Sequence, residues 1–552
     1  MRCSLAVLVL CCCASFTMPK YEDGLKNVGN TAGYKIASSY LREAMNLSVD
    51  PCEDFFEFTC GNWIANHPVP FDDYTYSQYE NISTKVEEKM REILESSENL
   101  GSKSIDALKA KYSRCMDKDE LNRFGARVLL ERIRSFGIWP ILEGDDKWRV
   151  ENFDLTSLLI HVSKIRRVHV FVKHTISLDS RNVSRCLIQF DRGSLKLAAD
   201  SYLDKETFGE TAYRQFLTDL VARLLQDAGL PKNETKIAND VDEIIDLETR
   251  LGNITAPKVN RRNHTEMYNL RRLSCMQKLI PSVNWTRYFH SIAPDDVHDY
   301  FSSNPEIVIV EIDYMRRVAD ILQSTDPRII TNYVYLKYAS IWVEEMGEQY
   351  ENISQALHGK KQREPRWKVC TKDIMLGEMQ YAVGAMYVRK AFDQASKNVT
   401  LEIIDNLLEV FYEVVLKNDW MDTKTKAMAL DKAKQMLRHI AYPDFILDNK
   451  KLDAYYSGLS VEGTDSYSQM MEKLSRWAIE HEFRRLVKPV DRNDFDFNPV
   501  MANAAHETSS NSISGLIFFL QLNFPGTAAV FLEIPAAMLQ FPFFHRTAPR
   551  LV

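Results

Sequence analysis

Helical periodicity over nearly four hundred residues constrains this sequence more than any other feature. From Ser104 to about Val490, apolar residues recur at the three- and four-residue spacing of amphipathic helices. Two short runs rich in β-branched residues are exceptions, and we expect strands at Val168 to Val172 and Glu306 to Ile312. The sequence therefore predicts a mainly α protein, and its 552 residues are too many for one compact core.

Three helices can be placed by their apolar stripes. The first spans Ser83 to Glu98, with the stripe Val86, Met90, Ile93 and Leu94. The second spans Leu401 to Lys417, with the stripe Ile404, Leu407, Leu408, Phe411, Val414 and Val415. The third begins at the N-cap Asp422 and runs to about Ile440, with the stripe Ala427, Leu430, Ala433, Leu437 and Ile440.

The N-terminus has the order of a secretory signal peptide. Arg2 precedes an apolar run from Leu5 to Phe16, and a polar stretch follows. A membrane-spanning helix needs about 20 apolar residues, which is more than this run contains. We therefore predict a signal peptide at residues 1–18 and a polar linker at 19–45. The alternative is an uncleaved segment that anchors the protein in a membrane.

Glycosylation acceptors and charge also point to a secreted protein. The formal net charge of −7 does not favour a nucleic-acid surface, so we expect no nucleic-acid partner. Acceptor sequences for N-linked sugars are spread over the body of the chain. They are Asn46, Asn81, Asn182, Asn233, Asn253, Asn263, Asn284, Asn352 and Asn398.

Six cysteines follow the predicted signal peptide. In an oxidising compartment we expect them to form disulfides. Six cysteines allow fifteen connectivities, and their spacing does not choose among them. They are Cys52, Cys60, Cys115, Cys186, Cys275 and Cys370.

Three stretches carry a resemblance to a known family. The first is DPCEDFFEFTCGNW, from Asp50 to Trp63. The second is NDWMDTKT, from Asn418 to Thr425, and it continues to Tyr-Pro-Asp at 442–444. The third combines Asn503-Ala504, Asn511 to Ile513 and EIPAAMLQFPFF at 533–544. Together they resemble the neprilysin and endothelin-converting-enzyme family of zinc metalloendopeptidases, over residues 50–513 and 533–545.

The resemblance implies a large helical lid domain facing a thermolysin-like α+β catalytic domain. The two domains would enclose a cavity that admits small peptides. We expect the neprilysin-like helical domain at 46–490 and only the first strands of the catalytic domain at 491–552. An apolar insert occupies 514–532, and removing it restores the spacing of the family. We interpret the insert as a retained intron or gene-model error, with the chain truncated before the zinc motif.

Zinc hydrolysis of a peptide bond needs three protein ligands and an open position for water. On a helix, two histidines four residues apart supply two ligands, and the intervening glutamate acts as base. No His-Glu-x-x-His occurs in the 552 residues. The resemblance implies zinc in the full-length family, but we expect none bound to this chain, no catalytic residue and no metal ligand.

Five histidines could be mistaken for metal ligands. His481-Glu482 and His506-Glu507 have Arg485 and Ser510 where a second histidine would have to be. We expect packing or surface roles for both histidines. His161, His169 and His174 lie in a basic, strand-like run, and a spacing of five would place the last two on opposite faces of a strand. We expect no metal site there.

The resemblance also implies specific roles for other residues. Asn503 and Ala504 correspond to a pair that binds the substrate backbone by strand addition, with an ordinary strand as the alternative. Cys115 and Cys370 correspond to a disulfide of the family. Cys52 and Cys60 correspond to cysteines whose partners lie late in the catalytic domain, so we expect them to be unpaired or rearranged. The resemblance does not assign Cys186 and Cys275.

Two functions follow as hypotheses. The first is a secreted neprilysin-like zinc metalloendopeptidase family member that is inactive as this chain, because the zinc site is missing. The second is a non-catalytic secreted module that binds small peptides or another partner. Both predict no membrane span beyond the N-terminal segment.

Overall fold

The chain folds into two compact units, the first combining Met1–Pro68 with Leu539–Val552 and the second comprising Val69–Met538. The computed structural model describes residues 31–70, 75–196, 208–255, 261, 263–358, 363–491, 494–495, 497–502, 505–507, 512–514 and 534–539. The predicted signal peptide, and most of the predicted insert at 514–532, lie outside the described residues.

In the first unit, α2 (Ala32–Ala44) contacts α3 (Phe55–Asn66). Asp54 caps α3 by accepting a hydrogen bond from the Glu57 backbone N–H. A Cβ at Gly61 would approach Asn46 Cβ to 3.1 Å, so the glycine lets the preceding loop lie close to the helix. The segment predicted as a linker at 19–45 therefore contains a helix.

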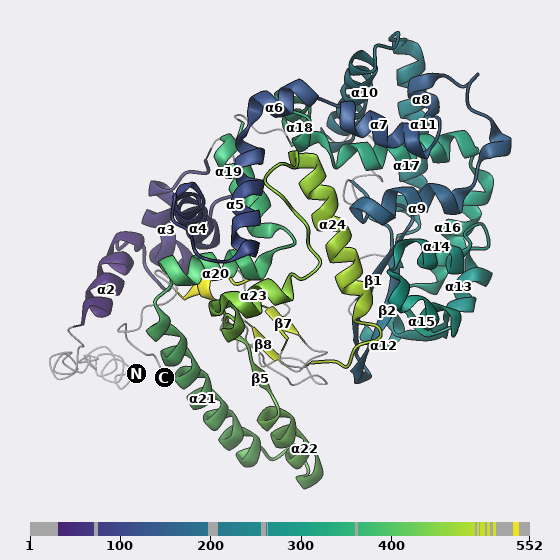
Figure 1. Ribbon diagram of the computed structural model, residues 1–552. Helices are drawn as coiled ribbons and strands as arrows, with labels where there is room; N and C mark the ends of the chain where they lie inside the picture. The colour runs from purple at the N-terminus through teal and green to yellow at the C-terminus, as the bar shows by residue number, and fades with distance from the viewer. Residues whose placement is uncertain are drawn as a thin grey trace, which may run out of the picture. The chain divides into compact units, whose positions relative to one another are not determined.

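The second unit is built mostly from helices, which confirms the mainly α prediction (Figure 1). Its helices are α4 (Gln78–Glu95), α5 (Lys103–Met116), α6 (Lys118–Phe124), α7 (Arg127–Phe136), α8 (Pro140–Glu143), α9 (Leu155–Arg166), α10 (Phe208–Asp227), α11 (Glu234–Asn253), α12 (His264–Met267), α13 (Leu273–Leu279), α14 (Trp285–Ile292), α15 (His298–Ser302), α16 (Ile312–Ser324), α17 (Pro327–Ser340), α18 (Glu348–His358), α19 (Arg366–Leu376), α20 (Gln380–Ala391), α21 (Gln394–Lys417), α22 (Thr423–Lys434), α23 (Asn449–Tyr455) and α24 (Tyr467–Arg484).

One four-stranded sheet lies among these helices in the order β1-β2-β4-β3. The β2–β4 pair is parallel and the other two pairs are antiparallel. The strands are β1 (Val172–Asp179), β2 (Asn182–Arg192), β3 (Asn269–Arg272) and β4 (Glu306–Ile309). The predicted strand at 306–312 is therefore confirmed over its first part, because α16 begins at Ile312. The one predicted at 168–172 is wrong, since β1 begins only at Val172.

A cluster of aromatic rings joins the sheet to the surrounding helices. Phe289 on α14 stacks on Phe301 of α15, with ring centroids 4.8 Å apart. The Phe289 ring also contacts Phe190 of β2 and Phe483 of α24 edge-on. Helix α24 contacts both α9 and α5, and Figure 1 shows it running between the group of helices around α5 and the group around α9. It therefore connects the two groups of helices.

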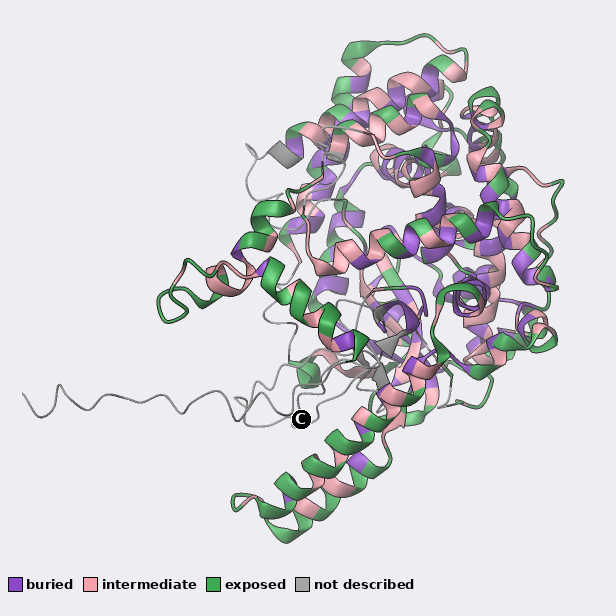
Figure 2. Ribbon diagram, turned by 90° about the vertical axis from the view of Figure 1, so that its left-hand side faces the viewer, coloured by how far each residue is buried: buried purple, intermediate pink, exposed green. Residues whose placement is uncertain are grey.

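Helices α21 and α22 form a hairpin that extends from the rest of the second unit (Figures 1 and 2). Asp422 caps α22 by accepting a 2.8 Å hydrogen bond from the Thr425 backbone N–H, as predicted. The predicted end of this helix is wrong, because α22 stops at Lys434. The next residues form the short strands β5 (Leu437–Arg438) and β6 (Ile440–Ala441).

These two strands pair with segments from far along the chain. β5 pairs in parallel with β8 (Ser512–Ser514), and β8 pairs in turn with β7 (Ala505–Glu507). β6 pairs in parallel with β9 (Ile534–Pro535). The pairings join residues on either side of the domain boundary that we expect near 490, and that boundary stays a prediction.

The stripes of the predicted helices have different outcomes. Helix α4 begins at Gln78 and ends at Glu95, and its four predicted stripe residues are all buried. Helix α21 begins at Gln394, and only Ile404 and Val415 of its six predicted stripe residues are buried. On α22, only Ala433 is buried. The helical period was correct in all three cases, but it predicted burial only in α4.

Candidate functional site

A disulfide lies at the centre of the polar residues that join α5, α19 and α24. Cys115, near the end of α5, is bonded to Cys370 in α19, with Cα atoms 5.7 Å apart. Both cysteines are fully buried. The bond confirms the pairing that the family resemblance implied, and it closes a loop of 255 residues.

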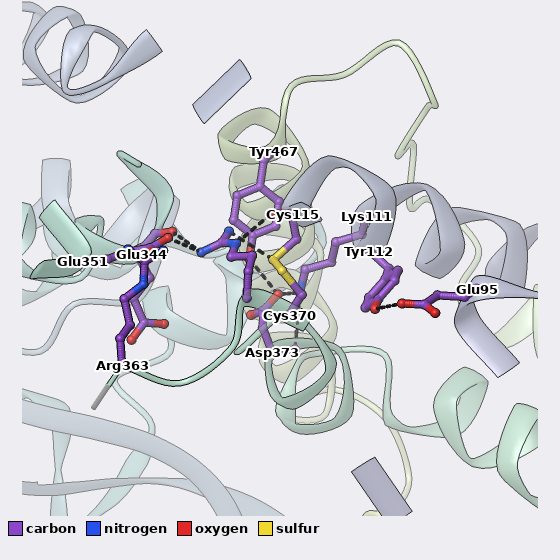
Figure 3. Close-up of a disulfide and its surroundings, with 11 residues drawn as sticks. Glu95, Lys111, Tyr112, Cys115, Glu344, Glu351, Arg363, Cys370, Asp373 and Tyr467 are labelled. Carbon is purple, nitrogen blue, oxygen red and sulfur yellow. Dashed lines mark hydrogen bonds and ion pairs between the residues drawn. A yellow bond between two sulfur atoms is a disulfide. The ribbon is translucent and has the colours of Figure 1, made fainter. Parts of the chain in front are cut away.

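A buried arginine contacts this disulfide directly (Figure 3). Arg366 donates from Nε to the Cys115 carbonyl oxygen at 2.8 Å, and from Nη2 to Cys115 Sγ at 3.2 Å. Its Nη1 pairs with Glu351 at 2.6 Å. Glu351 also pairs with Arg363 at 2.5 Å, so one carboxylate holds two guanidinium groups. These contacts connect α18 to α19 and α5.

A second buried group lies on the other side of the disulfide (Figure 3). Lys111 Nζ pairs with Asp373 Oδ2 at 2.8 Å, and the Tyr467 hydroxyl donates to the same oxygen at 2.8 Å. Burial, together with the Asp373 carboxylate, raises the pKa of Tyr467 well above its usual value. The hydroxyl therefore stays protonated and donates to Asp373, which ties α24 to α19 and α5.

These polar groups are suited to holding helices together rather than to catalysis. Each charged group already has an opposite charge, and the described contacts leave no nucleophile beside a free base. Local sequence carries no signal for this network, because Lys111 and Asp373 are 262 residues apart.

The first resemblance to a zinc motif, His481-Glu482, lies on α24 and both side chains are engaged. His481 stacks on Trp477 with centroids 4.9 Å apart, and its Nε2 lies 3.2 Å from the Tyr455 hydroxyl. Burial lowers the pKa of His481 to about 4, so the ring is neutral at physiological pH. Glu482 pairs with Arg167 at 2.8 Å and accepts a hydrogen bond from the Ile176 backbone N–H.

The second resemblance, His506-Glu507, lies on strand β7 and not on a helix. A strand does not bring residues i and i+4 together as one turn of helix does, so the geometry of the motif is absent there. Asn503 and Ala504, for which we expect substrate-backbone binding, lie outside the described residues.

The prediction that His169 and His174 face opposite sides of a strand is wrong. His169 lies three residues before the start of β1, and the two rings meet edge to face with centroids 4.5 Å apart. Burial lowers the pKa of His169 to about 3, and it lowers the pKa of His174 well below its usual value. His161 lies elsewhere, stacked on Phe136 at 4.7 Å.

The donor set does not fit a zinc ion. Within the described ranges, no three His, Cys, Asp or Glu side chains come close enough to hold a metal. His169 and His174 are a pair without a third ligand. His481 and Glu482 are committed to packing and to an ion pair, as described above.

The four other cysteines within the described residues form no disulfide in the structure. Cys52 is exposed, Cys60 and Cys275 are half-buried, and Cys186 is buried. The glycosylation acceptors are all at least partly accessible: Asn46 and Asn81 are half-buried, and the other seven are exposed. At Asn182 the side-chain oxygen accepts a hydrogen bond from the Ser184 hydroxyl at 2.6 Å.

One surface cavity was not anticipated from the sequence. It has a volume of about 480 Å³ and is lined by Arg181, Arg185, Arg271, Tyr268 and neighbouring residues. Arg185 pairs with Asp179 and Glu306, while Arg181 lies over the Tyr268 ring at 4.3 Å. None of the described helices has the length and apolar character needed to cross a bilayer.

Comparison with known proteins gives consistent matches along the chain. The profile of Peptidase family M13 matches residues 51–443, which is more than half of the chain. Neprilysin-1 of Caenorhabditis elegans is 41% identical over 544 residues, covering 97% of this chain and 69% of that protein. Neprilysin-11 of the same species is 35% identical over 534 residues, covering 95% of this chain and 60% of that protein. The chain thus spans between 60 and 69% of the length of these two relatives.

Solved structures agree on the fold. The zinc metalloprotease Zmp1 of Mycobacterium tuberculosis, in complex with an inhibitor, aligns with a TM-score of 0.74 at 20% identity, covering 92% of this chain and 71% of that one. The Haemonchus galactose containing glycoprotein complex aligns with a TM-score of 0.70 at 19% identity, covering 94% and 72%. Identities at this level show a shared fold.

Proposed function

The chain belongs to Peptidase family M13, and from that premise we propose that it is a secreted, neprilysin-like member whose 552 residues do not themselves hydrolyse peptides. The observation that carries this proposal is the absence of His-Glu-x-x-His from the whole sequence. The donor groups that remain are used elsewhere: His481 packs on Trp477, and Glu482 pairs with Arg167.

Zinc is the metal of the family, and the structural relative Zmp1 is a zinc metalloprotease. A zinc ion would supply an activated water and polarise the substrate carbonyl. We propose that this chain does not bind it, and we derive no catalytic step from its residues. Peptide hydrolysis by a longer protein containing this sequence is a separate proposal, supported by the neprilysin and endothelin-converting-enzyme relatives.

The proposed test is a fluorogenic peptide assay on the purified 552-residue chain, with an active neprilysin as positive control. We expect turnover at the background level, with and without added zinc. Turnover that a chelator abolishes and zinc restores would overturn the proposal. Variants His481→Ala and His506→Ala would then show whether either histidine contributes.

Secretion and glycosylation are part of the same proposal. The Cys115–Cys370 disulfide and the accessible acceptor asparagines support an oxidising, extracellular destination. We propose that Cys52 and Cys60 stay unpaired or pair differently from the family pattern. Expression in a secreting eukaryotic cell should release glycosylated protein into the medium. Retention of the protein with the membrane fraction would instead support an uncleaved N-terminal anchor.

The second candidate is a non-catalytic module that binds small peptides. It is favoured by the helical part, in which buried ion pairs and the disulfide hold α5, α18, α19 and α24 together. Strand addition at Asn503 and Ala504 would provide the contact with the peptide backbone. Calorimetry with the peptides of the activity assay discriminates between the two: saturable binding without turnover favours the module.

A further inference from the structure

One sulfur atom of the buried disulfide lies beside a cation. Arg366 Nη2 donates a hydrogen bond to Cys115 Sγ at 3.2 Å, whereas no hydrogen bond from a described residue reaches Cys370 Sγ. Both cysteines are 0% exposed and Arg366 is 5% exposed, so water screens this contact little. The two sulfur atoms therefore differ in their electrostatic surroundings.

The same guanidinium is anchored at points other than the sulfur. Its Nε donates to the Cys115 carbonyl oxygen at 2.8 Å, and its Nη1 donates to the Glu344 carbonyl oxygen at 3.2 Å and pairs with Glu351 at 2.6 Å. The Cys115 carbonyl lies in the last turn of α5, where carbonyl groups have no partner within the helix and a positive charge is favoured. Arg366 can therefore hold the end of α5 before the disulfide exists.

The position of Arg366 on α19 brings the two cysteines together. Arg366 and Cys370 are four residues apart, so they lie on the same face of the helix, about one turn from each other. A side chain that grips Cys115 through its backbone thus places that residue against Cys370. The Cα atoms of the two cysteines are 5.7 Å apart, a separation that a disulfide spans readily.

The charge of Arg366 also bears on the reactivity of Cys115. The thiolate, and not the thiol, is the nucleophile in disulfide exchange. An apolar, buried site disfavours the thiolate, and a neighbouring arginine favours it. Of the two cysteines, Cys115 is the one with an arginine hydrogen-bonded to its sulfur, so it is the better carrier of a negative charge.

The elements packed around α5 and α19 bring further charged and titratable groups, most of which Figure 3 shows. They are Glu87 of α4, Lys111 and Tyr112 of α5, Arg166 of α9, Glu344 and Glu345 before α18, Glu351 of α18, Arg363 before α19, Asp373 of α19 and Tyr467 of α24. Lys111 is compensated by Asp373 at 2.8 Å, whereas Glu351 is shared by the guanidinium groups of Arg363 and Arg366. The positive charge of Arg366 is therefore only partly compensated.

We propose that Arg366 is a positioning residue for disulfide formation, which docks α19 on the end of α5 and holds Cys115 as the reactive thiolate opposite Cys370. Six cysteines allow fifteen pairings, and this contact selects the native one before the covalent bond forms. In the finished protein, the same contact makes the bond asymmetric, with Cys115 as the better leaving group.

The chemical step is a thiol–disulfide exchange whose oxidant is a small disulfide such as oxidised glutathione. Cys370 first forms a mixed disulfide with one half of that oxidant, and the Cys115 thiolate then attacks Cys370 Sγ. The bond between the two cysteines forms as the bond from Cys370 to the small thiol breaks. The small thiol leaves with the electron pair and takes a proton from water. Reduction runs along the same path in reverse, so Cys115 is then the leaving thiolate.

The first test compares the two thiols without changing Arg366. In the full 552-residue chain, Cys370→Ala leaves Cys115 free and Cys115→Ala leaves Cys370 free, while the double variant gives the background of the other thiols. The ultraviolet absorbance of the thiolate is followed against pH under native conditions. We expect the ionised fraction of Cys115 at neutral pH to exceed that of Cys370 by about tenfold or more. Equal fractions, or a larger one for Cys370, overturn the proposal.

The second test removes the arginine from the Cys370→Ala chain. Arg366→Gln should lower the ionised fraction of Cys115 by about tenfold, because burial then acts without the neighbouring charge. Arg366→Lys should recover part of this loss, since lysine keeps the charge but lacks the planar fork. Loss of a purely structural contact would not shift the titration of the thiol in a protein that stays folded.

The matched control is Arg363→Gln. Arg363 pairs with Glu348 and with the same Glu351, and it makes no described contact with either cysteine. This variant should titrate like its parent, and unchanged circular dichroism verifies that the variants are folded. If Arg366→Gln and Arg363→Gln shift the titration equally, Arg366 has no special action on Cys115.

A third measurement uses the unmutated chain, so it decides the question even if the Arg366 variants do not fold. Reduced glutathione is raised until the Cys115–Cys370 bond opens in part, free thiols are blocked with a maleimide, and the modified peptides are mapped. We expect glutathione on Cys370 and the maleimide on Cys115. Glutathione mainly on Cys115, or equally on both cysteines, contradicts the proposed path.

Selection of the native pair is tested by refolding the reduced chain in a glutathione buffer. Arg366→Gln should regain the Cys115–Cys370 bond in several-fold lower yield than the parent, and Arg363→Gln should match the parent. Equal yields for all three chains would show that the cysteines find each other without Arg366. None of these results depends on whether the chain is secreted or hydrolyses peptides.

Discussion

Helices α4 and α21 carry apolar stripes of similar spacing, yet only the stripe of α4 is enclosed. Val86, Met90, Ile93 and Leu94 are at most 6% exposed, because α4 contacts α5, α19 and α20. In the described chain, helix α21 contacts mainly α22 and the short β6, and four of its apolar side chains are exposed: Leu407, Val410, Val414 and Leu416. Periodicity fixes which backbone a segment adopts, but burial depends on how many neighbours the fold supplies.

The largest expected effect separates the two helices directly. Met90 is fully buried in α4, so Met90→Ala should lower the free energy of unfolding by about 3 to 4 kcal/mol. Val410→Ala on α21 should cost less than about 0.5 kcal/mol, since its side chain is already 53% exposed. Urea titration of the purified variants measures both. If both variants lost the same free energy of unfolding, the apolar stripes of α4 and α21 would not differ in burial as described.

Removing the Cys115–Cys370 disulfide should lower the stability of the buried helices α5 and α19 and leave the α21–α22 hairpin unaffected. Cys115→Ala with Cys370→Ala should cost about 3 kcal/mol, because the bond restricts the unfolded chain over a 255-residue loop. Hydrogen exchange should rise in α5 and α19 and stay unchanged in α21 and α22. The paired control is Cys186→Ala with Cys275→Ala, which removes no disulfide of the structure. If hydrogen-exchange protection were lost only in α21 and α22, the disulfide would not stabilise α5 and α19 as we expect.

Acid should lower the free energy of unfolding, because His169 is buried in its neutral form. His169 has a folded pKa of about 3, below its unfolded value of about 6.5. Above pH 6.5 the ring is neutral in both states and has no effect. As the pH falls from 6.5 towards 3, only the unfolded state binds the proton, so stability is lost, by about 2 kcal/mol at pH 5.

His169→Phe should therefore reduce the fall in melting temperature between pH 7 and pH 5. His264→Phe, at an exposed position, serves as the control and should leave the pH profile unchanged. Identical profiles for both variants and the parent would show that the buried pair does not cause acid sensitivity.

The smallest expected effect lies on the hairpin. Asp422→Ala removes the N-cap of α22 and should destabilise that helix by about 1 kcal/mol. We expect faster hydrogen exchange in α22 with little change in global unfolding, because the hairpin makes few contacts with the other described helices. A matching drop in the global melting temperature would show that the two regions unfold together.

Much of the fold followed from local pattern. The helical period located α4 and α21, Asp422 marked the start of α22, and β-branched residues located β4. The end of α22 could not be foreseen, because Leu437 pairs with Ser512 and Ile440 with Ile534. The competing strand partners lie 75 and 94 residues further along, where no window of local sequence contains them.

The contacts around the disulfide were harder to predict from the sequence than the helices were. The Cys115–Cys370 bond came from the family resemblance, since spacing alone allowed fifteen connectivities. The Lys111–Asp373–Tyr467 group and the Arg366–Glu351 pair join residues that no motif links. The contact between His169 and His174 was missed because His169 lies outside β1, which begins at Val172 after a bend, so the alternation of a strand does not apply to the pair.

The order of synthesis has a consequence for the long disulfide loop. Cys115 leaves the ribosome 255 residues before Cys370, which at about 5 to 20 residues per second is a delay of roughly 10 to 50 s. If synthesis takes place into an oxidising compartment, Cys115 can react throughout that interval with Cys52 and Cys60, and later with Cys186 and Cys275. The native bond can then form only late, and any earlier disulfide of Cys115 with another thiol would have to be reversed before α19 can close against α5. Yield in a secreting cell should accordingly depend on thiol exchange more than on the stability of the finished protein.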